Sequence, residues 1–202
     1  MKNNYVNIEN LCMKYFVENK EVVVFNDFNL NIDITKINLL VGKSGSGKTT
    51  LLRLISGLEK PTSGTINIPS WIKVGIMFQE PRLMPWLNCE KNITLGLKNS
   101  DKTKVEEILN LVGLKDFKKA YPSQLSTGMK QRVSLARTLI RDTNLILMDE
   151  PFSSLDSNTK SEMMKLLIRV KNEKNAGVIF VTHDLKEAES IGDKIISLDK
   201  VK

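Results

Sequence analysis

Short apolar runs alternate along this chain with longer stretches in which apolar residues recur every three or four positions. The short runs have the length of buried strands and lie at 37–41, 74–78, 145–148, 178–181 and 194–198. The helical spacing covers 50–58, 105–112, 128–140 and 163–170. Helices that alternate with short apolar strands are typical of a parallel sheet covered by helices. The pattern therefore predicts an α/β fold with a parallel core.

Two regions depart from this alternation. Residues 5–35 contain the strand-like segments 22–25 and 28–32 separated by Asn and Asp, which predicts an antiparallel β element at the N-terminus. Residues 88–141 are mainly helical, with Val105, Ile108, Leu109 and Val112 on one face. We expect one domain over 1–202, with a core of about 1–87 and 142–202 and an inserted helical subdomain of about 88–141.

Composition limits the classes of function. A chain of 202 residues with 41% apolar content has enough material for one large core. The net charge of +7 would suit an anionic partner, but it is mostly lysine spread along the chain, and the six arginines do not cluster. No nucleic-acid partner is expected. No apolar run approaches the ~18 residues of a membrane span, which predicts a cytoplasmic protein.

The segment 42–49 matches the phosphate-binding pattern G-x-x-x-x-G-K-[ST]. It consists of Gly42, Lys43, Ser44, Gly45, Ser46, Gly47, Lys48 and Thr49. The pattern follows a predicted strand and precedes a helix that continues through Thr50, which is the setting such a loop requires. The glycines permit a tight turn of main-chain N–H groups around phosphate, Lys48 adds a positive charge, and the Thr49 hydroxyl is a Mg²⁺ ligand. Binding of a nucleoside triphosphate is predicted.

Asp149 and Glu150 follow the predicted strand 145–148. Ligands of open α/β sheets bind beyond the carboxyl ends of the strands, so both carboxylates are expected near the phosphate loop. We interpret Asp149 as a Mg²⁺ ligand beside Thr49 and Glu150 as the general base for an attacking water. By themselves these residues are equally consistent with a solvated acidic pair.

Further motifs occur in a fixed order. Gln79 follows the strand that ends at Phe78, and the segments 125–132 (LSTGMKQR) and 153–156 (SSLD) follow, with His183 after the last buried run. Together with the phosphate loop, this set resembles that of the ATPase subunits of ABC transporters: phosphate loop, Q-loop, signature motif, Walker B strand, D-loop and switch histidine. The resemblance covers essentially the whole chain and implies a P-loop ATPase that uses ATP and Mg²⁺.

The resemblance implies roles for the remaining residues. Tyr15 would stack on adenine, although it is also consistent with an ordinary core or surface tyrosine. Gln79 would contact Mg²⁺ and the attacking water, and His183 would orient Glu150 or the γ-phosphate. The signature residues and the D-loop would act on ATP held by a second subunit, so a head-to-tail dimer formed on ATP binding is expected. These residues are Ser126, Thr127, Gly128, Met129 and Asp156.

The signature departs from the usual L-S-G-G-Q, because Thr127 replaces the first glycine and Met129 replaces the glutamine. A β-branched residue restricts the backbone at this point, so binding should persist while the hydrolysis rate is affected. The segments 129–132 and 78–86, the latter with Pro85-Trp86, are similar to those of nitrate, sulfonate and taurine importers. This implies a membrane permease, an extracytoplasmic solute-binding protein and a location on the inner membrane face.

Other functions remain as alternatives. An exporter ATPase shares the core motifs, whereas non-transport ABC ATPases carry long coiled coils for which the interval between the phosphate loop and the signature is too short. A P-loop GTPase or small-molecule kinase would leave the signature unexplained, and no [NT]-K-x-D guanine motif occurs. Trp86 is interpreted as a permease contact or as part of the subdomain core. No C-terminal regulatory domain is expected after the last predicted strand, and the sequence does not identify the transported solute.

Overall fold

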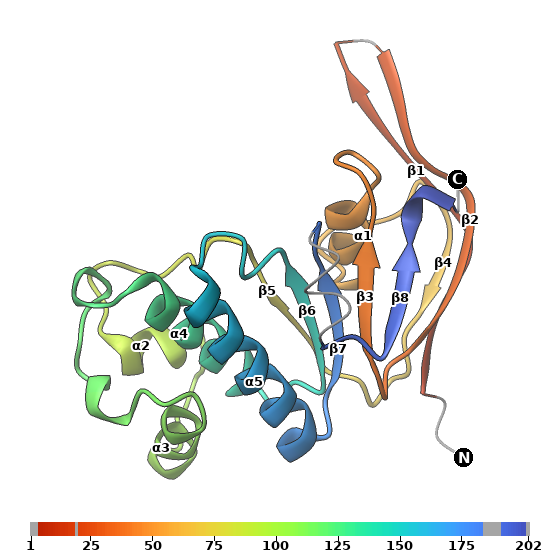
Figure 1. The fold of residues 1–202 in the computed structure, drawn as a ribbon. Helices are drawn as coiled ribbons and strands as arrows, with labels where there is room; N and C mark the ends of the chain where they lie inside the picture. The colour runs from red at the N-terminus through yellow and green to blue at the C-terminus, as the bar shows by residue number, and fades with distance from the viewer. Residues whose placement is uncertain (1–3, 19, 184–190, 201–202) are drawn as a thin grey trace.

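A five-stranded parallel sheet lies at the centre of the molecule (Figure 1). The structure is a computed structural model, and it describes residues 4–18, 20–183 and 191–200. The strand order is β5-β6-β7-β3-β8, and every neighbouring pair is parallel. The strands are β3 (Ile37–Val41), β5 (Val74–Met77), β6 (Leu145–Asp149), β7 (Gly177–Val181) and β8 (Lys194–Ser197). The predicted parallel α/β core is confirmed.

The central strands are apolar because both faces of this sheet are covered. Every residue of β3 and β7 is buried, as are the first four residues of β6. One face contacts α5 (Ser157–Lys174) through Met163, Leu166, Leu167 and Val170, the residues predicted to point inward. Strands buried on both faces read as continuous apolar runs, which explains why the sequence revealed them.

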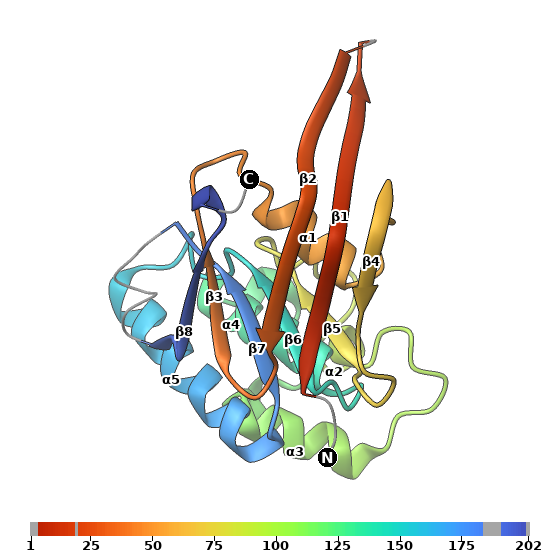
Figure 2. The same cartoon turned by 90° about the vertical axis from the view of Figure 1, so that its right-hand side faces the viewer.

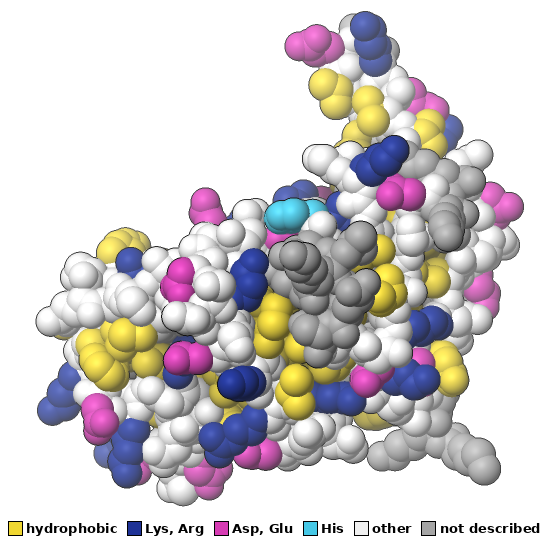
Figure 3. All heavy atoms as spheres, viewed as in Figure 1, with side chains coloured by type: hydrophobic (Ala, Val, Ile, Leu, Met, Phe, Trp, Pro, Cys, Tyr) yellow, Lys and Arg dark blue, Asp and Glu magenta, His cyan; other side chains and the backbone are white. Residues whose placement is uncertain are grey.

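A second, antiparallel sheet is formed by β1 (Tyr5–Val17), β2 (Lys20–Asp33) and β4 (Ser63–Asn67), in the order β2-β1-β4. The predicted N-terminal antiparallel element is thereby confirmed, whereas β4 was not predicted. Figure 2 shows β1 and β2 extending beyond the rest of the molecule. Their distal part exposes Phe16, Val17, Val22 and Val23, and hydrophobic side chains are visible on it in Figure 3.

Helix α1 (Lys48–Ile55) packs against residues of both sheets. Its Leu51, Leu52, Leu54 and Ile55 are buried in a cluster that includes side chains of both sheets. The prediction of a helix over 50–58 was wrong at its end, since the helix ends at Ile55 and Leu58 is 59% exposed.

Gly57 ends helix α1. It adopts a φ of 74°, which glycine tolerates without strain. The N–H of Gly57 donates to the carbonyl of Leu54 at 3.1 Å, and the N–H of Leu58 donates to the carbonyl of Arg53 at 3.0 Å. This is the Schellman arrangement, which satisfies the last carbonyls of the helix and turns the chain away from its axis. Leu58 is therefore directed out of the core.

Three helices gather at one end of the parallel sheet (Figure 1). They are α2 (Cys89–Ile93), α3 (Lys102–Leu111) and α4 (Thr127–Leu139), with short 3-10 turns at Lys115–Phe117 and Pro122–Gln124. Val105, Ile108, Leu109 and Val112 are buried, as the helical spacing predicted, whereas the short α2 was not predicted. The subdomain limits of 88 and 141 stay a prediction.

No described helix is both long enough and apolar enough to pass through a bilayer. The longest, α5, has 18 residues and ends with basic residues in its last turn.

Candidate active site

The phosphate loop joins β3 to α1. Gly45 and Gly47 have φ values of 77° and 97°, a region in which residues with a Cβ are strained. A Cβ on Gly47 would also lie 2.7 Å from Phe25 Cζ and 2.8 Å from Val24 Cγ1. The loop therefore needs glycine at this position both for its backbone conformation and for its close approach to β2.

Lys48 is 92% buried by its neighbours, with 8% exposure. Its ammonium donates to the carbonyls of Gly42 at 2.7 Å and Lys43 at 2.9 Å, so the charge is held inside the curve of the loop. The main-chain N–H of Lys43 donates to both carboxylate oxygens of Asp199, at 3.1 and 3.2 Å. The main-chain N–H of Lys43, a predicted site residue, is thus hydrogen-bonded to Asp199.

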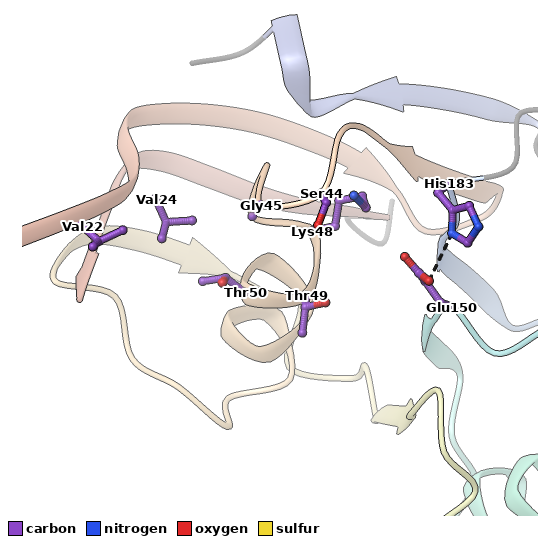
Figure 4. A pocket seen from close by; sticks show the side chains of 10 residues that line it. Val22, Val24, Ser44, Gly45, Lys48, Thr49, Thr50, Glu150 and His183 are labelled. Carbon is purple, nitrogen blue, oxygen red and sulfur yellow. Dashed lines mark hydrogen bonds and ion pairs between the residues drawn. The ribbon is translucent and has the colours of Figure 1, made fainter. Parts of the chain in front are cut away.

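The loop borders a cavity of about 590 Å³ (Figure 4). Its lining consists of Val22, Val24, Ser44, Gly45, Gly47, Lys48, Thr49, Thr50, Glu150 and His183. The structure therefore brings most of the phosphate loop together with two of the three predicted catalytic residues. Val22 and Val24 were missed, because alternating valines in a β-strand carry no signal that separates a pocket wall from a core position.

Glu150 and His183 contact each other at one side of this cavity (Figure 4). Glu150 follows β6, its N–H donates to the carbonyl of Val181 at 3.1 Å, and His183 follows β7, the next strand in the sheet. His183 Nδ1 lies 3.2 Å from Glu150 Oε2, as the dashed line in Figure 4 marks. Glu150 has a φ of 45°, a left-handed conformation that non-glycine residues adopt rarely and often at functional sites. Asp184, the last residue of the histidine motif, lies outside the described residues.

Asp149 ends β6 beside the phosphate loop. The Thr49 hydroxyl donates to Asp149 Oδ1 at 3.0 Å, which joins residues that are 100 positions apart. Burial raises the pKa of Asp149 above its ordinary value; the Thr49 hydrogen bond opposes this shift and the adjacent Glu150 charge adds to it. A partly buried carboxylate with a raised pKa gains from a nearby cation.

Gln79 completes a second cavity, of about 340 Å³, with Thr49 and Asp149 among its lining residues. The part of the chain that the structure describes has no group of three or more His, Cys, Asp or Glu side chains that would hold a metal alone. The hydroxyl, carboxylate and amide oxygens present here nevertheless fit Mg²⁺, which uses one or two protein carboxylates and completes its shell with phosphates and water. The predicted metal ligands thus share one cavity.

Tyr15 lies apart from this lining. It is on β1, paired in register with Val22, and its hydroxyl donates to the carboxylate of Glu59. Burial raises the pKa of Tyr15, and the hydrogen bond to Glu59 adds to the shift. The structure places Val22 rather than Tyr15 in the wall of the phosphate-loop cavity, so the adenine role of Tyr15 stays a prediction.

The signature residues begin α4. Ser126 caps this helix, since its side chain accepts from the N–H of Met129 at 3.2 Å. A Cβ on Gly128 would lie 2.4 Å from Thr159 Cγ2 of α5, so packing alone requires glycine there. Ser126, Gly128 and Met129 border a cavity of about 210 Å³ that is separate from the phosphate-loop cavity.

Asp156 caps α5 and accepts from the N–H groups of Asn158 at 3.1 Å and Thr159 at 3.0 Å. Neither this residue nor Thr127 lines the phosphate-loop cavity. One copy of the chain therefore does not bring the signature and the D-loop to its own phosphate loop, and their predicted roles remain predictions.

Comparison with known proteins gives consistent matches. The ABC transporter family matches residues 25–153. An aliphatic sulfonates import ATP-binding protein of Paracoccus denitrificans is 43% identical, with 87% of this chain and 73% of the relative covered. One of the same description from Bacillus cereus is 39% identical, with 95% and 80% covered. A solved dimer of an ATP-binding cassette in a post-hydrolysis state with ADP and phosphate is similar with a TM-score of 0.84, 31% identity and 95% and 93% coverage.

The raised pKa of Asp149 leads to a test of stability. A raised pKa means that the folded chain binds a proton more readily than the unfolded chain, so stability falls as pH rises from the ordinary to the raised value. Asp149→Asn keeps an oxygen acceptor for Thr49 and removes the charge. We expect this variant to melt about 2 °C higher than wild type at pH 7, the shift for less than about 1 kcal/mol in a chain of this size.

Calorimetric melting between pH 4 and 7.5 is the measurement, and the difference should vanish at the acidic end. Asp156→Asn is the matched control, because the pKa of Asp156 is lowered by hydrogen bonds from Thr159. The charged form of Asp156 therefore stabilises the folded chain at pH values above the ordinary pKa of aspartate. Asp156→Asn removes this charge, so the melting temperature at pH 7 should be unchanged or lower. A lower melting temperature for Asp149→Asn at pH 7 would refute the argument.

Proposed function

Since this chain belongs to the ABC transporter family, we propose that it is the ATP-hydrolysing subunit of a membrane importer for aliphatic sulfonates. The observation that carries this proposal is the Glu150–His183 pair at 3.2 Å in the cavity that the phosphate loop borders. A loop that binds phosphate needs only main-chain N–H groups and a lysine. A carboxylate oriented by a histidine in the same cavity adds a group suited to activating water.

The phosphate loop would hold ATP through main-chain N–H groups and the N-terminus of α1, whose dipole favours anions. Lys48 would exchange its two carbonyl acceptors for oxygens of the β- and γ-phosphates. Thr49, Asp149 and Gln79 would hold Mg²⁺, which supplies charge neutralisation on the phosphates when bound. The lining of the two cavities supports this division of roles.

Glu150 would accept a proton from the water that attacks the γ-phosphate, with ADP as the leaving group. His183 would hold the carboxylate in place through the Nδ1–Oε2 contact. Its own ring remains accessible, since the side chain is 66% exposed, and can therefore also contact the transferred phosphate. The left-handed backbone of Glu150 supports this role, because strain of this kind is retained where it places a functional group.

A second copy would complete the site. The separate location of Ser126, Gly128 and Asp156 supports contacts to ATP across a head-to-tail dimer rather than within one chain. The similar cassette of known structure is dimeric, which supports the same arrangement. Ser126 caps a helix of 13 residues, and its N-terminus would approach the γ-phosphate of the partner's ATP.

Glu150→Gln tests the catalytic assignment. The amide keeps the size and polarity of the carboxylate but does not accept the proton, so ATP should bind within about threefold of wild type while hydrolysis falls at least ~100-fold. Calorimetry, phosphate release and size-exclusion chromatography with ATP are the measurements, and the variant should accumulate as a dimer. Glu107→Gln, on the exposed face of α3, is the control and should hydrolyse ATP as wild type does. Rapid turnover by Glu150→Gln would exclude Glu150 as the base.

The loop after Gln79 supports attachment to a permease at the inner face of the membrane. Trp86 is 70% exposed, so the alternative that it closes the subdomain core does not apply. The buried Asn92 holds this loop, accepting from the N–H of Met84 at 2.8 Å and donating to the carbonyls of Met84 at 3.1 Å and Leu87 at 2.8 Å. An exposed tryptophan on a braced loop is suited to anchor a protein interface.

Trp86→Ala should therefore weaken assembly with the permease at least tenfold and leave the fold intact. Because the side chain is exposed, the melting temperature should stay within about 2 °C of wild type. Co-purification with the permease and a melting curve are the measurements. Phe16→Ala, at an equally exposed aromatic residue of the β1–β2 hairpin, is the control and should assemble normally. Normal assembly of Trp86→Ala would remove this loop from the interface.

The solute is proposed from the relatives, two of which are described as import ATP-binding proteins for aliphatic sulfonates. An extracytoplasmic binding protein would deliver the sulfonate to the permease. A strain that lacks this chain should lose growth on an alkanesulfonate as sole sulfur source and keep growth on sulfate. Complementation with wild type should restore growth, and Lys48→Ala should not. Unchanged growth on the sulfonate would refute the substrate assignment.

A further inference from the structure

Gln79 is held at two points by residues outside the loop that contains it. Its main-chain carbonyl accepts from Gln131 Nε2 at 2.8 Å, and its side-chain Nε2 donates to Ser153 Oγ at 3.1 Å. Gln131 belongs to α4, and Ser153 lies in the turn between β6 and α5. The Q-loop glutamine is therefore connected to the signature helix through its backbone and to the segment after Glu150 through its side chain.

The contact with Gln131 fixes the backbone firmly. Gln131 has no exposed surface, and its Oε1 has no hydrogen-bond partner among the described residues. A buried amide N–H is unfavourable without an acceptor, and the Gln79 carbonyl supplies one for Gln131 Nε2. The contact with α4 thus positions the Gln79 backbone. It does not orient the exposed Gln79 side chain, which needs a contact of its own.

Ser153 sets that direction. Its hydroxyl donates its single hydrogen to the carbonyl of Glu150 at 3.0 Å, so toward Gln79 it acts only as an acceptor. An acceptor selects the NH₂ end of an amide. The oxygen Oε1 of Gln79 is then the end that remains available to the cavity shared with Thr49 and Asp149.

We propose that Ser153 is a positioning residue for Gln79, which orients the amide so that its oxygen, and not its nitrogen, is presented to the metal and water of the ATPase site. The proposal rests on the proposed function of this cavity. The same hydroxyl connects Gln79 to the backbone of Glu150, the residue whose carboxylate contacts His183. A metal ligand and the proposed general base are thereby joined through one serine.

The first test observes Gln79 directly in the nucleotide-free protein. The side-chain NH₂ signals of Gln79 are identified in an ¹⁵N–¹H spectrum by their loss in Gln79→Glu. In Ser153→Ala these signals should move to the positions of an unstructured glutamine amide, whereas Ser153→Thr, which keeps the hydroxyl, should preserve them. Unchanged Gln79 signals in Ser153→Ala would overturn the proposal, and this readout does not depend on ATPase activity.

The second test measures the contribution of Mg²⁺ to ATP binding, as the ratio of ATP dissociation constants in EDTA and in Mg²⁺. Loss of one orienting hydrogen bond should reduce this ratio by about 3- to 10-fold in Ser153→Ala, with ATP affinity in EDTA unchanged. Ser161→Ala is the matched control, since Ser161 is an exposed serine of α5 outside the D-loop and makes no side-chain hydrogen bond to the described residues.

The outcomes distinguish the role of Ser153 from the ATPase assignment. A wild-type ratio in Ser153→Ala, or the same reduced ratio in Ser161→Ala, would overturn the role of Ser153 and leave the ATPase assignment intact. Absence of ATP binding by the wild type would instead refute the proposed function. Ser153→Thr is expected to restore the ratio. If it does not, and the Gln79 NH₂ signals are also lost in that variant, the hydroxyl is not the orienting group.

Discussion

The burial of α1 against residues of both sheets is the constraint on which the site depends. Leu51 and Leu52 are fully buried, and Leu54 and Ile55 nearly so, each contributing roughly 1.5–3 kcal/mol relative to an exposed side chain. A helix packed against both sheets has little freedom to shift or rotate. Its first turn, and the loop that leads into it from β3, are thereby held at one place. Lys48 and Thr49 obtain their positions from this packing rather than from contacts in the loop alone.

Parallel strand order then brings the other groups to the same edge. β6, β7 and β3 are successive neighbours, so the residues after each strand emerge side by side. Asp149 and Glu150 follow β6, His183 follows β7, and the phosphate loop follows β3. The sequence predicted this convergence because each motif directly follows an apolar run, and the carboxyl ends of parallel strands share an edge. Strands buried on both faces are the elements that a sequence reveals most clearly.

What the sequence did not reveal depends on packing between distant segments. β4 contains Ser63, Gly64 and Thr65 and has no apolar run, so its place in the sheet is set by pairing with β1. Leu58 fits a helical face, but the glycine before it ends the helix. Val22, Val24 and Ser153 take part in the site only because folding brings together elements that are distant in the sequence. Residue type alone does not separate such positions from ordinary strand or turn residues.

The contact between Gly128 and Thr159 links two parts of the expected dimer surface, the start of α4 and the start of α5. Since a Cβ at 128 would lie 2.4 Å from the Thr159 methyl carbon, the start of α4 and the start of α5 are in contact without a gap. Any side chain at 128 demands a smaller residue at 159 or a wider spacing of the helices. The two positions are therefore constrained as a pair, and substitutions tolerated at one are decided by the other. The shape of this surface therefore depends on both positions together.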